Sequence, residues 1–450
     1  ESSAHRTMLL LQRSPMAMLP AKRVARLKAS GALRIYGGSL ELCAPPCRAP
    51  LTCRAVAVAS HDSISSIRMP VADDVVASLS SPKYDKTGAD LELVSISRKQ
   101  LDELLQAEAS SMAYIPARRV NMHELLDVLS PRRQAKFIQS EVPKRYAQRL
   151  RQIKSLENWR DVEEIAKVHK LLFDAFCSLR LVRRGREWGL EEFTDCVREN
   201  KRNCKASMEL ITIGMAKLYE GSGNKYDQAF IDKFVNKFLL NKISCEFLTS
   251  QYLACVGGSD LGIIDKECDP TFICKRAANQ VARLCQKETG VKVPWSIKTY
   301  TTGSMTGDSC VFTYIPQYLF YVITELLKNS FSATASARSG VSDLSKYPIH
   351  IIVSCDEERV AIRISDRAGG IPFQVGERVW SYLYSTAPKA SPLSGHGVGL
   401  PLSRLYAGYL GGKLELSTMP GYGTDAYLLL PRMQSGVQEE SLPVDALVHA

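Results

Sequence analysis

Hydrophobic spacing divides this chain into two parts that must fold differently. From about Ser97 to Val256, apolar residues recur at intervals of three, four and seven, the spacing of amphipathic helices. After Asp269-Pro270 the pattern is mixed, and apolar residues alternate with others along Val360–Ser365, as in a strand with two different faces. A helical domain is therefore expected to precede a domain that combines helices with a sheet.

The helical part is interrupted by turn-forming residues at Ser130-Pro131, Gly185–Gly189 and Gly221–Gly223. The segments between these breaks are long enough for about four long helices, which predicts a four-helix bundle. In the second part, helices are predicted over Phe272–Glu288, Gln317–Ala335 and Leu400–Leu410, and strands over Ile349–Ser354, Val360–Ser365, Lys413–Ser417 and Ala426–Leu430. Helices packed on a mainly antiparallel sheet make an α/β sandwich, so the fold class is multidomain, α followed by α+β.

The net charge of +11 is concentrated at the start of the chain. Residues 1–60 carry nine basic and two acidic residues, which leaves only +4 for the remaining 390 residues. A basic, Arg- and Ala-rich segment of this kind is typical of an organellar transit peptide. The basic charge is thus better interpreted as part of a targeting signal than as a nucleic-acid-binding surface. The 45% hydrophobic content excludes disorder as the main state, and no apolar run is long enough to span a membrane.

These patterns predict five segments: a basic transit segment over 1–60, a linker over 61–94, a helical regulatory and docking domain over 95–265, a second domain over 266–432 and a tail over 433–450. The thirteen cysteines form no CxxC pair and no zinc-type spacing with histidine. We therefore expect reduced, mostly buried thiols and no zinc site.

Three islands of small, polar and acidic residues follow one another in the second part. Glu325, Lys328 and Asn329 share one helix face, where oxygen ligands for Mg²⁺ and a charge for phosphate can meet. Asp366 begins Asp-Arg-Ala-Gly-Gly370-Ile-Pro directly after a strand, and its carboxylate can accept a hydrogen bond from a base. Gly395-His-Gly397-Val398-Gly399-Leu400-Pro opens a helix, where successive N–H groups bind anions. The stretch 385–394 before it has the composition of a lid.

Together these islands and Gly421-Tyr-Gly-Thr424-Asp resemble the four ATP-binding boxes of the GHKL superfamily of kinases and ATPases. More narrowly, Tyr382–Pro388, Gly399–Tyr406 and Gly421–Tyr427 resemble the mitochondrial pyruvate dehydrogenase kinases and the related branched-chain 2-oxoacid dehydrogenase kinase. Phe137–Arg145 and Phe234–Gln251 are similar to bundle helices of that family, so the resemblance covers about residues 97–432. It implies a GHKL (Bergerat-type) ATP-binding domain behind the helical bundle.

The resemblance also implies roles. Glu325 would be the general base toward a substrate serine, Lys328 would lie near the phosphates, and Asn329 would bind Mg²⁺. Asp366 would bind the adenine amino group, with Thr424 beside it. The remaining nucleotide contacts would come from Gly370, Ser385, Thr386, Gly395, Gly397, Val398, Gly399 and Leu400. ATP and Mg²⁺ are the implied cofactors.

Some positions depart from the family pattern. The family's Arg-His pair on a bundle helix is Asn203-Cys204 here, its histidine four residues before the base is Tyr321, and its arginine after the Asn box is Ser332. Ala368 replaces the first glycine of the Asp box, and the family's C-terminal tryptophan has no counterpart after Pro443.

The implied function is a protein-serine kinase, a transferase of the mitochondrial matrix that phosphorylates and inactivates the decarboxylase subunit of the pyruvate dehydrogenase complex. The implied partners are that decarboxylase, a lipoyl domain of the acyltransferase core and a second copy of the chain, without nucleic acid. Two alternatives stay open: the branched-chain complex as target, and a nucleotide-binding pseudokinase that docks without transfer. A sensor-type histidine kinase would need His123 or His169 as acceptor.

Overall fold

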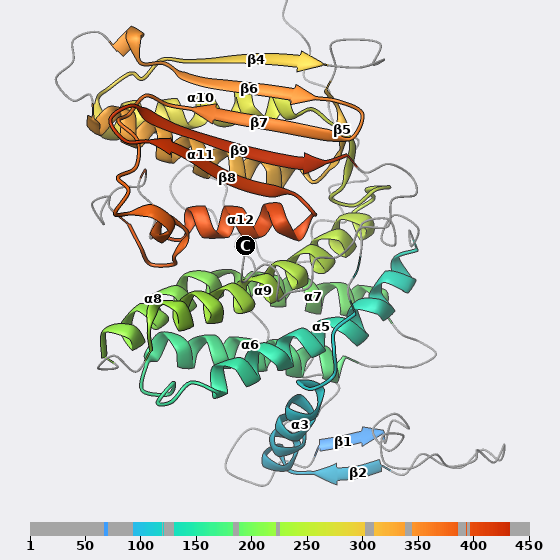
Figure 1. Ribbon diagram of the computed structural model, residues 1–450. Coiled ribbons are helices and arrows are strands. Elements are labelled where there is room, and N and C mark those ends of the chain that lie inside the picture. Colours follow the sequence, from blue (N-terminus) through green and yellow to red (C-terminus); the bar gives the residue numbers. More distant parts are fainter. Residues whose placement is uncertain are drawn as a thin grey trace, which may run out of the picture.

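The computed structural model describes residues 67–70, 93–118, 120, 130–182, 189–221, 226–301, 310–337, 344–385, 393 and 397–432. The predicted transit segment and tail lie outside this part, as does most of the predicted linker. The described chain forms a helical region and a sheet domain stacked on it (Figure 1).

The helical region contains α3 (Arg98–Met112), α5 (Pro131–Lys154), α6 (Glu163–Leu181), α7 (Leu190–Asn203), α8 (Ser207–Gly221) and α9 (Gln228–Val256). It has more breaks than the sequence predicted, because the turns at 155–162 and Cys204–Ala206 contain neither glycine nor proline. Pairs α5–α6, α6–α8, α8–α9 and α9–α5 are in contact, so these four helices surround one core. Ile165, Leu172 and Phe238 are fully buried within it.

Aspartates cap the starts of α9 and α10. Asp227 precedes α9, and its carboxylate accepts a hydrogen bond from the Phe230 N–H at 2.8 Å. Asp269 does the same for the first turn of α10 (Pro270–Thr289), which has proline at its first position. Each cap satisfies backbone donors that a helix start leaves without partners.

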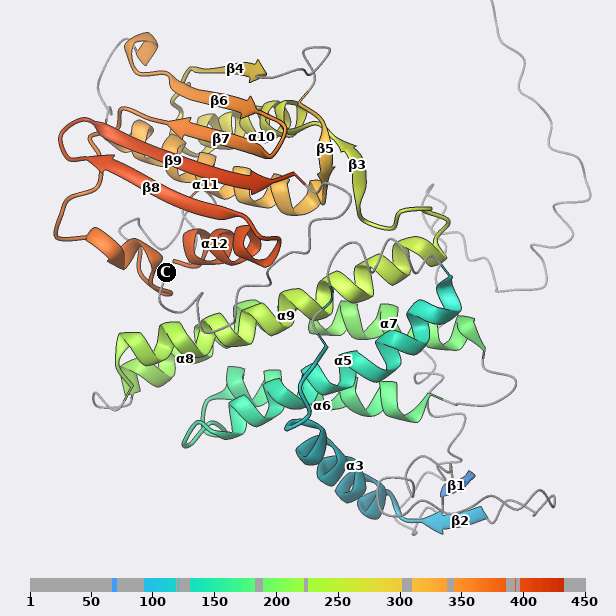
Figure 2. The same cartoon turned by 45° about the vertical axis from the view of Figure 1, so that its right-hand side comes forward.

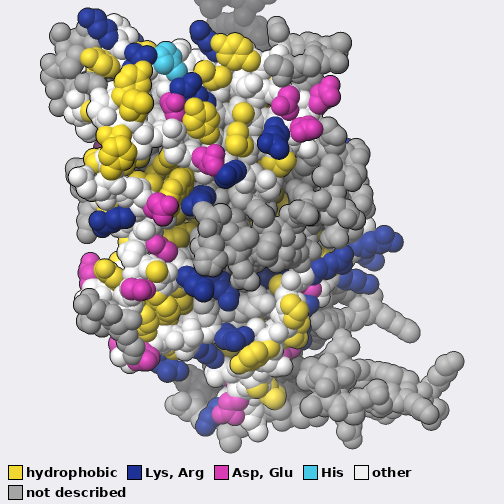
Figure 3. Space-filling view, viewed as in Figure 1, with side chains coloured by type: hydrophobic (Ala, Val, Ile, Leu, Met, Phe, Trp, Pro, Cys, Tyr) yellow, Lys and Arg dark blue, Asp and Glu magenta, His cyan; other side chains and the backbone are white. Residues whose placement is uncertain are grey.

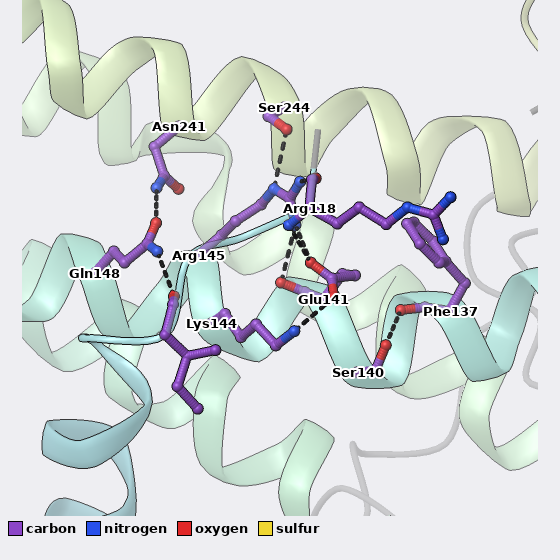
Figure 4. Close-up of polar contacts among 10 residues, drawn as sticks. Arg118, Phe137, Ser140, Glu141, Lys144, Arg145, Gln148, Asn241 and Ser244 are labelled. Carbon is purple, nitrogen blue, oxygen red and sulfur yellow. Dashed lines mark hydrogen bonds and ion pairs between the residues drawn. The ribbon is translucent and has the colours of Figure 1, made fainter. Parts of the chain in front are cut away.

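A buried polar cluster ties the chain after α3 to α5 and α9 (Figure 4). The Glu141 carboxylate accepts the Arg118 N–H at 2.8 Å and pairs with Lys144 at 2.6 Å and with Arg145 at 3.2 Å. Arg145 also donates to the Arg118 carbonyl at 2.6 Å and to the Ser244 hydroxyl at 3.0 Å. Because three segments meet on one ion pair, this cluster fixes their relative positions.

The sheet has the order β4-β6-β7-β9-β8, formed by Trp295–Thr301, Ile349–Cys355, Arg359–Ser365, Gly423–Pro431 and Lys413–Met419. The β4–β6 pair is parallel and the other pairs are antiparallel. Helices α10, α11 (Pro316–Ala337) and α12 (Gly399–Tyr409) lie on one face, and no described helix covers the other (Figures 1 and 2). Burial alternates along β7 as a result: Val360, Ile362 and Ile364 are buried under the helices, and the residues between them are more exposed.

The helical region meets the sheet domain where α12 lies along α9 (Figure 2). Phe247 of α9 packs edge-on against Tyr409 of α12, with ring centroids 5.8 Å apart. This contact joins the end of α12 to α9.

The structure confirms the predicted helix and strand positions in the sheet domain to within a few residues. It adds β4, the β3–β5 pair (Asp265–Cys268, Phe312–Tyr314) and a β1–β2 pair (Ile67–Pro70, Leu93–Ile96). Strand β1 lies inside the segment expected to be a linker, and β2 spans the end of that segment.

Cysteine chemistry differs from the expectation at one place. Cys310 and Cys355 form a disulfide, so the prediction of reduced thiols is wrong for this pair. The two residues are 45 positions apart and are brought together only by the pairing of distant segments, which spacing along the chain does not reveal. The other described cysteines are free thiols. Among the described helices, none is long and apolar enough to cross a membrane.

Candidate functional site

A cavity of about 640 Å³ opens between α11, the end of β7 and the start of α12. Its volume is in the range of small-molecule and cofactor sites. Predicted residues on its wall are Glu325, Asn329, Asp366, Gly370, Ser385, Gly397, Gly399, Leu400 and Thr424. All three predicted islands therefore meet at one hollow, although they are far apart in sequence.

Other predicted residues lie elsewhere. Lys328 and Val398 adjoin the cavity without lining it. Thr386 and Gly395 lie outside the described residues, as does most of the predicted lid stretch.

Asp366 lies at the inner end of the cavity, 6% exposed. Its carboxylate accepts hydrogen bonds from the Ser330 hydroxyl at 2.9 Å, the Ala368 N–H at 3.1 Å and the Thr424 N–H at 3.3 Å. Burial raises the pKa of this carboxyl above its usual value, although these three donors act in the opposite direction. A buried, oriented carboxylate of this kind suits a ligand that donates a hydrogen bond.

Glu325 projects from α11 toward the first residue of α12. A Cβ atom at Gly399 would come within 2.5 Å of the Glu325 Oε2 atom, so only glycine allows this approach. On its other side, the Glu325 Oε1 atom accepts a hydrogen bond from the Lys328 ammonium at 3.1 Å. Both side chains are about 15% exposed, and the pair holds the carboxylate at the cavity wall.

Backbone N–H groups at the start of α12 complete the polar wall. A helix start attracts anions through its free N–H groups and its dipole. Gly397 has φ +72°, and a Cβ there would come within 2.7 Å of the Tyr384 carbonyl oxygen. This close packing explains why the glycine-rich island precedes the helix.

The apolar wall was not predicted as part of the site. It consists of Leu326, Ile371, Pro372, Val375, Val379, Leu393, Leu416 and Ala426. Leu416 and Ala426 face each other across β8 and β9 on the helix-covered side of the sheet. A flat ligand group can pack between such side chains while Asp366 and Thr424 fix its edge. For Leu416 and Ala426 strand alternation was the available signal, and it does not separate cavity wall from core. Ser330, which was also missed, directly follows the predicted Asn329.

The departures from the family pattern occupy three different environments. Ser332 lines the cavity. Tyr321 packs on Tyr406 with ring centroids 5.1 Å apart, and burial raises its pKa, so it remains a neutral phenol. Cys204 lies between α7 and α8, half-buried, with a pKa also raised by burial.

His169 is half-buried against an aromatic ring. Its ring stacks on Trp159 at 4.4 Å, and its Nε2 atom is buried without a hydrogen-bond partner. Burial, with Lys154 and Arg160 nearby, lowers its pKa to about 4. His123 lies outside the described residues. The environment of His169 therefore disfavours the histidine-kinase alternative.

Charges on the face of Figure 3 are mixed. Basic and acidic side chains alternate over the uncovered side of the sheet, without a continuous basic patch among the described residues of that face. The described residues also contain no group of three or more His, Cys, Asp or Glu that could hold a metal ion by itself.

Two family models match this chain. The family described as mitochondrial branched-chain alpha-ketoacid dehydrogenase kinase matches residues 119–269. The family described as histidine kinase-, DNA gyrase B-, and HSP90-like ATPase matches residues 315–434, which contain every cavity residue named above.

Individual relatives agree with both models. A mitochondrial pyruvate dehydrogenase (acetyl-transferring) kinase of Arabidopsis thaliana is 32% identical over 332 residues, 69% of this chain and 87% of that protein. Isozyme 4 of Ictidomys tridecemlineatus is 35% identical over 224 residues, 47% of this chain and 53% of that protein. Isozyme 1 of Mus musculus is 31% identical over 269 residues, 56% of this chain and 61% of that protein. The chain thus spans about half the length of the isozyme 4 relatives that it matches.

Proposed function

Because this chain belongs to the family of mitochondrial pyruvate dehydrogenase and branched-chain α-ketoacid dehydrogenase kinases, we propose that it is an ATP-dependent protein-serine kinase. Its substrate is the decarboxylase subunit of the mitochondrial pyruvate dehydrogenase complex, which phosphorylation inactivates. The name of the Arabidopsis relative, 87% of which is covered, supports this target.

The observation that carries the proposal is the position of Glu325 beside Gly399. A carboxylate at the glycine-rich start of α12 lies where phosphates bound to the helix N–H groups would end. A substrate serine entering from solvent can give its proton to Glu325 while its oxygen attacks the γ-phosphorus and ADP leaves. Lys328 holds the carboxylate and adds positive charge near the phosphates.

We assign the adenine end to Asp366 and Thr424, with Gly370 and the apolar wall around the ring. The buried Asp366 carboxylate can accept the amino group of adenine, which guanine lacks at that position. Ser385, Leu400 and the backbone of Gly397 and Gly399, which line the cavity, would complete the nucleotide contacts. Thr386, Gly395 and Val398 are proposed from the resemblance alone.

The residues present fit a magnesium ion shared with the nucleotide. Asn329 offers an amide oxygen beside the Glu325 carboxylate, and Mg²⁺ commonly takes few protein ligands and completes its shell with phosphate oxygens and water. Asn329 is the residue that would hold it. Bound Mg²⁺ neutralises charge on the phosphoryl group during transfer.

The wider assignments are proposals as well. We propose residues 95–265 as a docking domain with a four-helix core, supported by the contacts among α5, α6, α8 and α9, and residues 266–432 as the GHKL kinase domain. We also propose docking of a lipoyl domain on the helical region, a homodimer, and residence in the mitochondrial matrix after loss of residues 1–60. The relatives' names support the mitochondrial location.

Two alternative functions are each favoured by a specific observation. The match of residues 119–269 to the branched-chain kinase model favours the branched-chain decarboxylase as target. The neutral phenol of Tyr321 at the position of a family histidine favours a pseudokinase that binds nucleotide without transfer.

One assay separates these functions. The protein is incubated with Mg-ATP and, in parallel, with the pyruvate and the branched-chain decarboxylase, and phosphoserine is quantified. We expect phosphoserine predominantly on the pyruvate enzyme. Preferential labelling of the branched-chain enzyme would replace the target, and confirmed ATP binding without phosphoserine on either protein would replace kinase by pseudokinase.

A further inference from the structure

Tyr382 connects the cavity wall to the helical region through all of its polar groups. Its N–H donates to the Asp232 carboxylate at 2.8 Å, and its phenol donates to the Asn236 side-chain oxygen at 2.8 Å. Its carbonyl accepts from the Gln228 side-chain amide at 3.0 Å. The Tyr382 side chain is buried, with the residue 2% exposed.

The three partners form one face of α9. Gln228, Asp232 and Asn236 are spaced by four residues, so their side chains stack along the helix. Gln228 also donates to the Asp232 carboxylate at 3.0 Å, which fixes these two side chains relative to each other. Three α9 side chains therefore hold one residue of the sheet domain, Tyr382, by three hydrogen bonds.

The next residue is conformationally costly. Leu383 has φ +68°, and Leu383 and Asn158 are the non-glycine residues with positive φ in the described part of the chain. A branched residue is strained in this region and persists there where its surroundings hold it. The Leu383 N–H donates to the Gly397 carbonyl at 3.0 Å, so this turn joins the two segments that flank the cavity.

The cavity wall begins immediately beyond this turn. Tyr384 and Ser385 line the cavity from one side, and Gly397 and Gly399 line it from the other. Since the Tyr384 carbonyl leaves no room for a side chain at Gly397, a shift of one segment moves the other. The position of Tyr382 therefore sets the position of the phosphate end of the wall.

We propose that Tyr382 and its α9 partners Gln228, Asp232 and Asn236 are positioning residues that hold the cavity wall in the conformation that binds nucleotide. The identity of the ligand rests on the proposed function, whereas the contact of Tyr382 with α9 does not.

The principal test is ATP affinity measured by calorimetry on the full chain. Tyr382→Phe and Asn236→Ala each remove the phenol hydrogen bond. We expect each to raise the Kd for Mg-ATP about five- to tenfold, because a smaller fraction of molecules has the competent wall. The rate of phosphotransfer at saturating ATP should change less than twofold, since no group at the reacting atoms is altered.

The matched control is Tyr252→Phe. The Tyr252 hydroxyl is also buried and shares a hydrogen bond of 2.7 Å with Thr194, but within the helical region. We expect this variant to lose stability to a similar extent and to keep its ATP affinity. Equal ATP affinity in wild type, Tyr382→Phe and Tyr252→Phe would overturn the proposal and leave Tyr382 as a purely structural contact.

A double variant tests the specific pair. Asn236→Ala in the Tyr382→Phe background should raise the Kd for Mg-ATP no further, because the two substitutions remove the same hydrogen bond. If the two substitutions lowered the affinity for Mg-ATP additively, the Tyr382–Asn236 hydrogen bond would not be the cause of the effect.

Hydrogen exchange separates this inference from the proposed function. The amides of residues 376–385 should exchange faster in Tyr382→Phe than in wild type and in Tyr252→Phe, without any nucleotide. If wild type binds no ATP, the proposed function fails, while faster exchange still supports the positioning role and unchanged exchange refutes it.

Discussion

At the scale of single residues, the Asp366 carboxyl combines burial in the cavity wall with a raised pKa. Its buried carboxylate lies in the cavity wall without a cation among its hydrogen-bond partners, and burial raises its pKa above the usual 3.8. A raised folded-state pKa favours the protonated form, so the contribution of this group to stability is fully present below pH 3.8 and is lost as pH rises through the folded-state pKa. At neutral pH the ionised Asp366 carboxylate therefore contributes less to stability than its protonated form would.

Asp366→Asn should therefore gain stability relative to wild type as pH rises from about 3.5 to 7, while ATP binding falls at least tenfold. Urea unfolding at several pH values measures the first effect and calorimetry the second. Asp356→Asn is the control of opposite sign, because two backbone N–H groups lower the pKa of Asp356. Parallel pH profiles for Asp366→Asn and wild type would contradict the account of Asp366.

Gly399 provides a second test at this scale. Gly399→Ala places a methyl group against the Glu325 Oε2 atom, which moves because it is the end of a flexible side chain. We expect stability to stay nearly unchanged and phosphotransfer to fall about 100-fold, the effect of displacing a reacting group by about 1 Å.

Gly221→Ala, at a helix end with no atom within 4 Å of the new methyl group, should retain full activity. Full activity of Gly399→Ala as well would mean that Glu325 is not required at this position.

Single residues were predictable where local pattern identified them. Glu325, Asn329 and Asp366 stand in polar islands next to a helix face or a strand end, and the structure brings them to one cavity. The sequence did not predict that Lys328 pairs with Glu325. An i, i+3 ion pair on a helix depends on side-chain rotamers, which the sequence does not specify.

At the scale of elements, the Glu141–Arg145 cluster joins α5, α9 and the chain after α3 (Figure 4). Both side chains are about 5% exposed. Burial raises the Glu141 pKa, but Lys144, Arg145 and the Arg118 N–H more than offset this, so the pKa is lowered. Its contribution to stability is thus present above pH 4.5 and lost as pH falls through the lowered pKa.

Glu141→Gln should lower the free energy of unfolding at pH 7 by about 3 kcal/mol, since it leaves a buried guanidinium without its carboxylate. Chemical denaturation measures the loss, which should shrink toward pH 3. Glu103→Gln, which removes the exposed pair with Lys99, should have almost no effect. A loss at Glu141 as small as at Glu103, or one independent of pH, would contradict this assignment.

Elements with strong periodicity were predictable, and those defined by distant partners were not. The strands β6, β7, β8 and β9 alternate and were found in the sequence. In β4 the burial does not alternate, because it is an edge strand that pairs in parallel with β6 alone. The break between α7 and α8 at Cys204–Ala206 has no turn-forming residue to mark it.

At the scale of the whole molecule, the sequence predicted two parts but not their contact. The Tyr382 hydrogen bonds to α9 and the Phe247–Tyr409 packing join residues that are 146 to 162 positions apart. Nothing in local composition distinguishes these side chains from ordinary core residues. Yet they place the helical region directly against the elements that carry the cavity.

The central claim is that Glu325 takes the serine proton during transfer from ATP bound beside it. Single-turnover phosphotransfer to the pyruvate dehydrogenase decarboxylase, with wild type and Glu325→Gln at saturating Mg-ATP, tests it most directly. We predict that Glu325→Gln binds ATP within about threefold of wild type and transfers phosphate at least 100-fold more slowly. Transfer by Glu325→Gln at the wild-type rate would contradict the claim.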